Sequence, residues 1–253
     1  MRPRAVIAGA LFWACTRACL AASPAPDPDV ILRQAFDHYR AGTSESRVVM
    51  TIHRTDWERR LELTADTHGH DDALVRFTAP AKDAGSATLQ LAGETWVFNP
   101  RLNQVIRLPQ SMLSRSWMGS DFSYSDLAKS EDLLTLYTHR LTATRLDEGH
   151  AVWTIEATPR PGAPVVWGKV AVTVRDDWVI VEETFFDQDF KAARRMTTDK
   201  IGRLDGRPYP VSMTMQPLDQ PGQWTRVETQ EAHFDIPLPG WVFTLSNLQT
   251  PRR

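Results

Sequence analysis

The sequence SWMGSDFSYSDL occupies residues 116–127, near the middle of the chain, and follows a short predicted strand at residues 104–109. It combines one tryptophan and one glycine with short polar residues, which favour turns and helix N-caps over a helix interior. Its last residues, Ser125-Asp126-Leu127, are typical of the start of a short helix. It contains no nucleophile–base pair and no metal-ligand spacing. The residues alone therefore favour a structural crossover between two groups of strands.

Residues 1–21 have the features of a secretory signal peptide. Arg2 and Arg4 precede a short apolar run at residues 5–14, and small residues follow at a cleavage point after residue 21 or 22. The run is too short to span a bilayer. We therefore expect an exported protein with a single mature domain at residues 22–253, located in the periplasm.

Both cysteines, Cys15 and Cys19, lie inside the predicted signal peptide. The residues before them do not fit a lipoprotein cleavage site, so a soluble product is favoured. The mature domain would fold without a disulfide and could not perform thiolate chemistry. Without residues 1–21 the chain has 26 basic and 31 acidic residues, a net charge of −5. Such a mildly acidic chain without a basic stripe is not expected to bind nucleic acid.

The pattern of the mature chain predicts one N-terminal helix followed by antiparallel strands. Residues 29–42 carry apolar side chains at helical spacing, and Gly42 is placed to end that helix. Apolar and polar residues then alternate, as in strands with one apolar face. The alternation returns in the second half, in Leu134–Arg145, Ala151–Thr158, Gly168–Arg175, Trp178–Phe186, Phe190–Ile201, Tyr209–Met215 and Gln223–Phe234.

The number of strands fits a barrel, a half-barrel or a sandwich, and the alternation does not choose among them. A resemblance does. Residues 117–127 resemble the signature of the outer-membrane lipoprotein-sorting protein family, whose members are LolA-like periplasmic proteins often encoded beside RND-type exporters. Residues 75–87, 96–100 and 243–248 resemble other parts of that family. The signature positions are Trp117, Met118, Gly119, Ser120, Asp121, Phe122, Tyr124, Asp126 and Leu127, with Arg107 on the preceding strand.

The resemblance implies a mainly β fold: an incomplete antiparallel β-barrel (a LolA-like half-barrel) with an N-terminal helix and short helical lid segments. It implies a monomeric carrier without catalysis, cofactor or metal, which binds lipid or lipoprotein acyl chains. Its task would be outer-membrane lipoprotein sorting or lipid transport linked to an RND-type exporter. We expect Trp117 and Phe122 to hold the crossover at the barrel mouth as part of a lid, with Gly119 supplying backbone freedom and Asp121 capping the next helix.

A barrel too wide to be filled by its own side chains can keep a ligand cavity. Alternating apolar residues in the first half of the chain are the candidates to line it, although each could instead be plain core. The candidates are Met50, Ile52, Leu61, Leu63, Val75, Phe77, Leu89, Leu91, Trp96 and Phe98.

Other features leave weaker alternatives. Arg107 could bind an anionic headgroup, but a structural ion pair with Asp121 is the more frequent use of such an arginine. The run at residues 68–72 has histidines and aspartates at a hairpin turn without a distant partner cluster, which argues against a metal site. Glu182, Glu183, Asp187 and Asp189 could approach one another on adjacent strands, but a solvated strand face explains them more simply. Two rivals to a carrier are a lipid-sensing regulator of the same fold and a hydrolase using scattered carboxylates, which would need a convergent acidic pair.

Overall fold

The computed structural model describes residues 26–127 and 129–252, so the predicted signal peptide and its cleavage point lie outside the described residues. The first half contains helix α1 and six strands. Their bounds are α1 Pro28–Arg40, β1 Thr43–His53, β2 Glu58–His68, β3 Asp72–Ala79, β4 Ala87–Leu91, β5 Glu94–Asn99 and β6 Gln104–Arg107. Residues 108–136, called the crossover below, hold the 3₁₀ helices η1 Gln110–Met112 and η2 Tyr124–Leu127 and the helix α2 Lys129–Thr135.

Seven strands and two short helices complete the fold. They are β7 Tyr137–Asp147, β8 His150–Pro159, β9 Lys169–Arg175, β10 Ile180–Phe186, β11 Ala192–Leu204, β12 Arg207–Pro217, β13 Trp224–Phe234, η3 Gly240–Phe243 and α3 Leu245–Gln249. The predicted second-half strands are all present, with corrections at their starts. Leu134 belongs to α2, whereas Trp178 and Phe190 lie in turns with φ of 68° and 60° and precede their strands. Alternation does not distinguish such a turn residue from the first strand residue.

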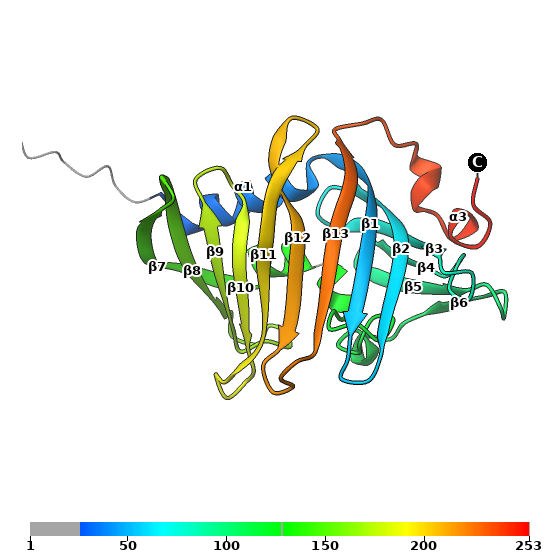
Figure 1. Cartoon of the computed structure of the whole chain (residues 1–253), viewed down its shortest axis with the longest axis horizontal. Helices are drawn as coiled ribbons and strands as arrows, with labels where there is room; N and C mark the ends of the chain where they lie inside the picture. Colours follow the sequence, from blue (N-terminus) through cyan, green and yellow to red (C-terminus); the bar gives the residue numbers. More distant parts are fainter. Residues whose placement is uncertain (1–25, 128, 253) are drawn as a thin grey trace, which may run out of the picture.

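All thirteen strands form one antiparallel sheet in which β1 pairs with β13 (Figure 1). The chain proceeds from the centre out to β6 at one edge, and the crossover then carries it to β7 at the other edge. From β7 the strands follow in order back to the centre. Because β6 and β7 are not paired with each other, the sheet is not closed. The predicted mainly β, incomplete antiparallel barrel with one N-terminal helix is confirmed.

Strand register separates the two faces of the sheet. We call the face that carries Met50, Leu63 and Val75 the inner face; α1 and the crossover cover it. Along β3, Leu74 points to the opposite, outer face, because successive side chains alternate. Leu74 pairs with Leu89 across β4, and Val75 pairs with Thr88. Leu89 and Leu91 of β4 and Trp96 and Phe98 of β5 therefore belong to the outer face.

The helix α1 is built by local sequence signals. The carboxylate of Asp27 accepts a hydrogen bond from the Asp29 amide at 2.8 Å, and Pro28 occupies the first helical turn. Ile31, Leu32 and Phe36 form its buried stripe and pack with residues of β8–β10 and α2. Helical residues end at Arg40, and Ala41, with φ of 56°, turns the chain into β1.

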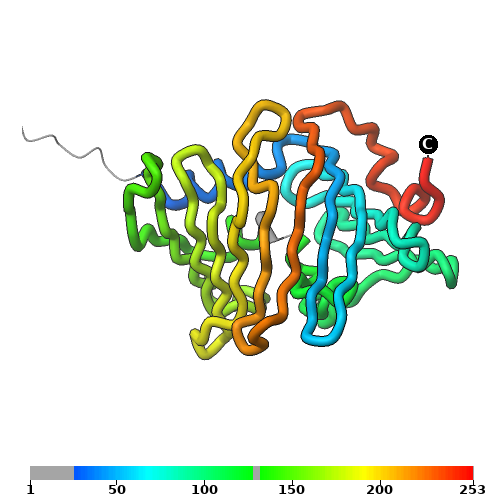
Figure 2. The backbone as a smooth tube through the Cα atoms, in the orientation of Figure 1, coloured from blue at the N-terminus to red at the C-terminus, as the bar shows by residue number. Residues whose placement is uncertain are grey.

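The C-terminal segment covers the outer face beside β3, β4 and β5 (Figure 2). Val242, Phe243 and Leu248 pack against Leu74 and Phe98. The Arg76 guanidinium donates to the main-chain oxygens of residues 247 and 248, at 2.7 and 3.2 Å. The outer apolar face of this half of the sheet is thus closed by the chain itself.

Candidate functional site

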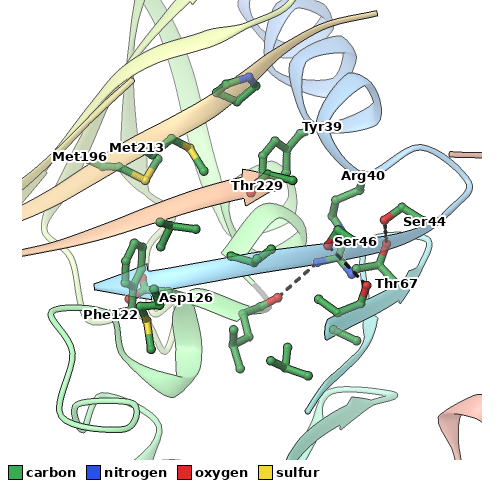
Figure 3. Close-up of a pocket in the computed structure, with 18 of the residues that line it drawn as sticks. Tyr39, Arg40, Ser44, Ser46, Thr67, Phe122, Asp126, Met196, Met213 and Thr229 are labelled. Atoms are coloured by element: carbon green, nitrogen blue, oxygen red, sulfur yellow. Dashed lines mark hydrogen bonds between the residues drawn. The ribbon is translucent and has the colours of Figure 1, made fainter. Parts of the chain in front are cut away.

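A cavity of about 250 Å³ lies between the inner face of the sheet, α1 and the crossover (Figure 3). Strands from both halves of the chain contribute to its wall. The lining residues are Phe36, Tyr39, Arg40, Ser44, Ser46, Val48, Met50, Leu63, Ala65, Thr67, Ala73, Val75, Trp117, Phe122, Asp126, Leu127, Ile180, Glu183, Met196, Tyr209, Pro210, Met213, Met215, Val227 and Thr229.

The wall changes in chemistry along β1, whose lining residues run in the order Ser44, Ser46, Val48, Met50. The methionine end of the cavity comprises Met50, Met196, Met213 and Met215, which strand register places together through Val227 and the β11–β12 pair. The hydroxyl end comprises Tyr39, Ser44, Ser46 and Thr67 (Figure 3). There the Ser44 and Thr67 hydroxyls form a hydrogen bond of 2.6 Å across β1 and β2.

Arg40 stands at the hydroxyl end and is buried. Its Nε, Nη1 and Nη2 atoms donate to the main-chain oxygens of Gly69 (2.9 Å), Leu127 (3.2 Å) and Asp72 (2.8 Å). Desolvation lowers its pKa, and the nearby Asp71 and Asp72 act in the opposite direction. The guanidinium, which proteins do not deprotonate, therefore ties the end of α1 to the crossover and to the β2–β3 turn.

Tyr39 and Tyr209 meet at the same end with nearly parallel rings, 5.3 Å between centroids and 9° between planes. Burial raises the pKa of Tyr39 and raises that of Tyr209 well above its ordinary value. Both side chains are therefore neutral phenols at physiological pH, and each can donate or accept a hydrogen bond.

Two buried ion pairs anchor the crossover to the sheet. Arg54, after β1, holds both carboxylate oxygens of Asp121 at 3.0 and 3.1 Å, and the Thr225 hydroxyl donates to the same carboxylate at 2.6 Å. Arg194 on β11 donates to Asp126 at 2.5 Å. Asp126 also accepts from the Ser123 amide at 2.6 Å. The expectation that Asp121 caps the following helix is wrong: Asp126 holds the turn, and Asp121 is held by Arg54.

Of the remaining signature residues, Phe122 and Leu127 line the cavity, whereas Gly119 and Trp117 have structural roles. Gly119 has φ of +80°, which agrees with its predicted need for backbone freedom. Trp117 is only 5% exposed, lies 5.3 Å from the Phe77 ring and donates from Nε1 to the Thr88 hydroxyl at 3.2 Å. It borders the cavity as a core residue, so its expected place in a lid at the barrel mouth is wrong.

The ten predicted lining residues divide into three groups. Met50, Leu63 and Val75 line the cavity. Ile52, Leu61 and Phe77 are buried beside it, packed around Trp117. The third group, on the outer face under the C-terminal segment, is Leu89, Leu91, Trp96 and Phe98. Placing this last group in the cavity is wrong, because the β3–β4 register puts Leu89 opposite Leu74.

The predicted set omits other lining residues, because it holds only alternating strand residues from the first half of the chain. Phe36 and Tyr39 belong to the apolar stripe of α1, and Met213 and Met215 alternate along β12. The alternation on β12 was visible in the sequence; the pairing of β1 with β13, which brings these strands to the same cavity, was not.

The structure also shows which residues contact Arg107 and the histidines considered as metal ligands. Arg107 pairs with Glu94 on the neighbouring strand and not with Asp121. His68 faces Asp72 at 3.5 Å, and His70 contacts Asp37 at 2.8 Å. His150, Asp176 and Asp177 do cluster, but Arg175 donates to Asp177 at 2.6 Å and contacts His150 at 3.0 Å, filling the place of a cation.

Glu182, Glu183 and Asp187 do not form a convergent acidic group. Glu183 faces the cavity and is buried, whereas Glu182 is its neighbour on β10 and therefore points to the other face. Asp187 lies in the following turn, and its carboxylate accepts hydrogen bonds from the amides of Asp189 and Lys191 at 3.0 and 2.9 Å.

None of the described helices is long and apolar enough to cross a membrane.

Comparison with known proteins agrees with this architecture. A family model described only as an uncharacterized protein matches residues 69–250. The search of curated proteins gave no match. A DUF1329 family protein from Desulfovibrio piger has a similar structure, with a TM-score of 0.79 at 21% identity, covering 88% of this chain and all of that one.

Two further structures share the fold. An outer membrane lipoprotein-sorting protein domain from Vibrio parahaemolyticus superposes with a TM-score of 0.73 at 20% identity, covering 88% of this chain and 98% of that one. A LolA superfamily protein from Nitrosomonas europaea gives 0.73 at 20% identity, covering 87% and 98%. This chain therefore belongs to the uncharacterized family matched over residues 69–250, and it has the fold of the LolA superfamily and of outer-membrane lipoprotein-sorting proteins.

Proposed function

We propose that this protein is a periplasmic carrier that holds lipid, or the acyl chain of a lipoprotein, in the cavity on the inner face of its sheet. The observation that carries the proposal is the cavity itself, which is walled by methionine, valine and aromatic side chains from both halves of the chain. Flexible thioether side chains adapt to apolar ligands of varied shape. The likeness in fold to a lipoprotein-sorting protein domain supports the same function.

Binding needs no covalent chemistry. Each methylene moved from water into the cavity contributes about 0.8 kcal/mol, so a single acyl chain provides enough free energy for useful affinity. Release needs the crossover and α1 to separate, and both cover the inner face. The Arg40 hydrogen bond to the oxygen of Leu127 joins these two parts.

An exported carrier would act as a monomer between an RND-type exporter in the inner membrane and the outer membrane.

A displacement assay tests this function. An environment-sensitive fatty-acid probe should gain fluorescence in the mature protein, and phospholipid or a diacylated lipopeptide should displace it. Vesicle-to-vesicle transfer of a labelled lipid should then be faster with the protein than without it. A folded protein that neither binds the probe nor accelerates transfer would contradict the carrier function.

A further inference from the structure

The two ends of the cavity define the class of ligand more narrowly than an apolar cavity alone. The methionine end can surround a hydrocarbon tail with adaptable thioether side chains. The carboxylates nearest to it are Glu183, which pairs with Met196 across β10 and β11, and Asp126. The hydroxyl end has the side-chain oxygens of Ser44, Ser46, Thr67 and Tyr39 within the same wall (Figure 3). An occupant that satisfies both ends is amphiphilic, with its tail among the methionines.

The charged groups of the wall already have partners. Arg40 donates to three main-chain oxygens. Asp126 is paired with Arg194, whose guanidinium also stacks 4.6 Å from the Trp167 ring. Glu183 is likewise engaged in an interaction. An anionic headgroup would therefore enter a region in which the lining cation Arg40 is held by carbonyls and flanked by Asp71 and Asp72, and desolvating such a charge is costly.

The hydroxyl groups favour an uncharged head. Serine, threonine and neutral tyrosine side chains each offer one donor and acceptor lone pairs. They can therefore hydrogen-bond an ester carbonyl, an amide or a hydroxyl group of a ligand, and they neutralise no charge. Ser46 is suited to this role, because the only hydrogen bond of its hydroxyl in the described part of the chain is a long one of 3.5 Å to the oxygen of Ala65.

The size of the cavity limits the number of chains. Pockets for drug-sized molecules usually span about 300–1,000 Å³, and this cavity has about 250 Å³. It suits one acyl chain with a small head and not the two chains of a phospholipid.

Resting on the carrier function proposed above, we infer that the cavity takes a single-chain amphiphile with an uncharged hydrogen-bonding head, such as a monoacylglycerol or the ester-linked end of one lipoprotein chain. The tail lies at the methionine end and the head lies at the hydroxyl end.

A matched ligand series tests the class. Monoacylglycerol, the free fatty acid of the same chain length and a diacyl phosphatidylglycerol should compete with the fluorescent probe for the mature protein. We expect monoacylglycerol to bind at least about tenfold more tightly than either competitor, a difference of about 1.4 kcal/mol. Equal or tighter binding of the fatty acid or of phosphatidylglycerol would overturn the inferred class and leave the carrier function standing. Failure of every lipid to displace the probe would contradict the carrier function itself.

Paired variants test the position of the head. Ser46→Ala should weaken monoacylglycerol binding about fivefold, the size of one net hydrogen bond. Ser212→Ala is the control, because Ser212 neighbours the lining residue Met213 on β12 and so points to the outer face. An equal effect of the two substitutions would contradict a head at Ser46.

Orientation can be measured directly by NMR with ¹³C-methyl methionine. A monoacylglycerol carrying a nitroxide near its terminal carbon should broaden the methyl signals of Met196 and Met213 more than one carrying the nitroxide beside its ester. The reverse order would overturn the inferred orientation.

Discussion

Arg54 and Asp121 join the first hairpin of the sheet to the crossover through an ion pair with two short contacts, in which both side chains are largely buried. The two residues are 67 positions apart in the sequence, and their contact holds the signature segment against the end of β1. Together with Arg194 and Asp126 it fixes residues 121–126 against the inner face. We therefore expect residues 121–126 to stay fixed to the sheet, and the cavity to open to ligands through movement of other segments.

Removing one partner of this pair should destabilise the protein strongly. Asp121→Ala leaves the Arg54 guanidinium buried without its carboxylate, which typically costs about 3–5 kcal/mol. Arg47→Ala is the matched control, since its pair with Glu231 is exposed to solvent and contributes little to stability. Urea unfolding of both variants measures the difference. Similar losses in the two variants would show that the buried pair is not a main anchor.

Trp117 should behave as a core residue. Trp117→Ala removes a side chain that is 5% exposed and packs on Phe77, so we expect a loss of about 3–5 kcal/mol in unfolding free energy. Trp57→Ala, at a position 44% exposed on the β1–β2 turn, should cost much less. Thermal and urea unfolding of the two variants provide the comparison, and a small loss at Trp117 would argue against its place in the core.

Substitutions on the inner and outer faces of the sheet should differ in their effect on lipid binding. Met213→Gln introduces a polar amide into the cavity wall and should weaken binding of the probe, whereas Leu91→Gln changes the outer face under the C-terminal segment. Because both changes also affect packing, the unfolding free energy of each variant is measured beside its probe affinity. Weaker probe binding in a folded Leu91→Gln variant, with no change in Met213→Gln, would contradict the assignment of the faces.

Asp66 should make stability depend on pH. Burial, followed by the charge of Glu45, raises its pKa from 3.8 to about 6. The folded state therefore keeps the proton that the unfolded chain loses first, and the contribution of this group to stability falls as pH rises from about 4 to 6. Asp66→Asn should be more stable than the parent protein at pH 7, with the difference shrinking toward pH 4. A difference between the two proteins that does not change with pH would contradict the raised pKa.

Local patterns predict the fold well because they depend on neighbouring residues. The apolar stripe of α1 and the alternation of the strands are both present in the sequence. The cavity was harder to predict, since its wall depends on which strands pair. Leu89 and Val75 both alternate correctly, yet the β3–β4 register sends them to opposite faces.

For the same reason, the sequence alone does not predict which distant residues contact each other. Arg107 and Arg54 are both arginines near strand ends, and nothing local shows that Arg54 is the partner of Asp121. Likewise, the methionines of β12 reach the cavity only because β13 lies between β12 and β1. A single sequence without pairing information does not contain that order.

The most direct test of the carrier account is mass spectrometry of the mature protein purified from the periplasm without detergent. Native spectra should show a fraction of the protein with a bound mass corresponding to one lipid, and solvent extraction should release a molecule with a single acyl chain and an uncharged head. Met213→Gln should retain less of it than Leu91→Gln. Protein that is folded and free of any lipid, and that takes none up from added lipid, would contradict the central claim.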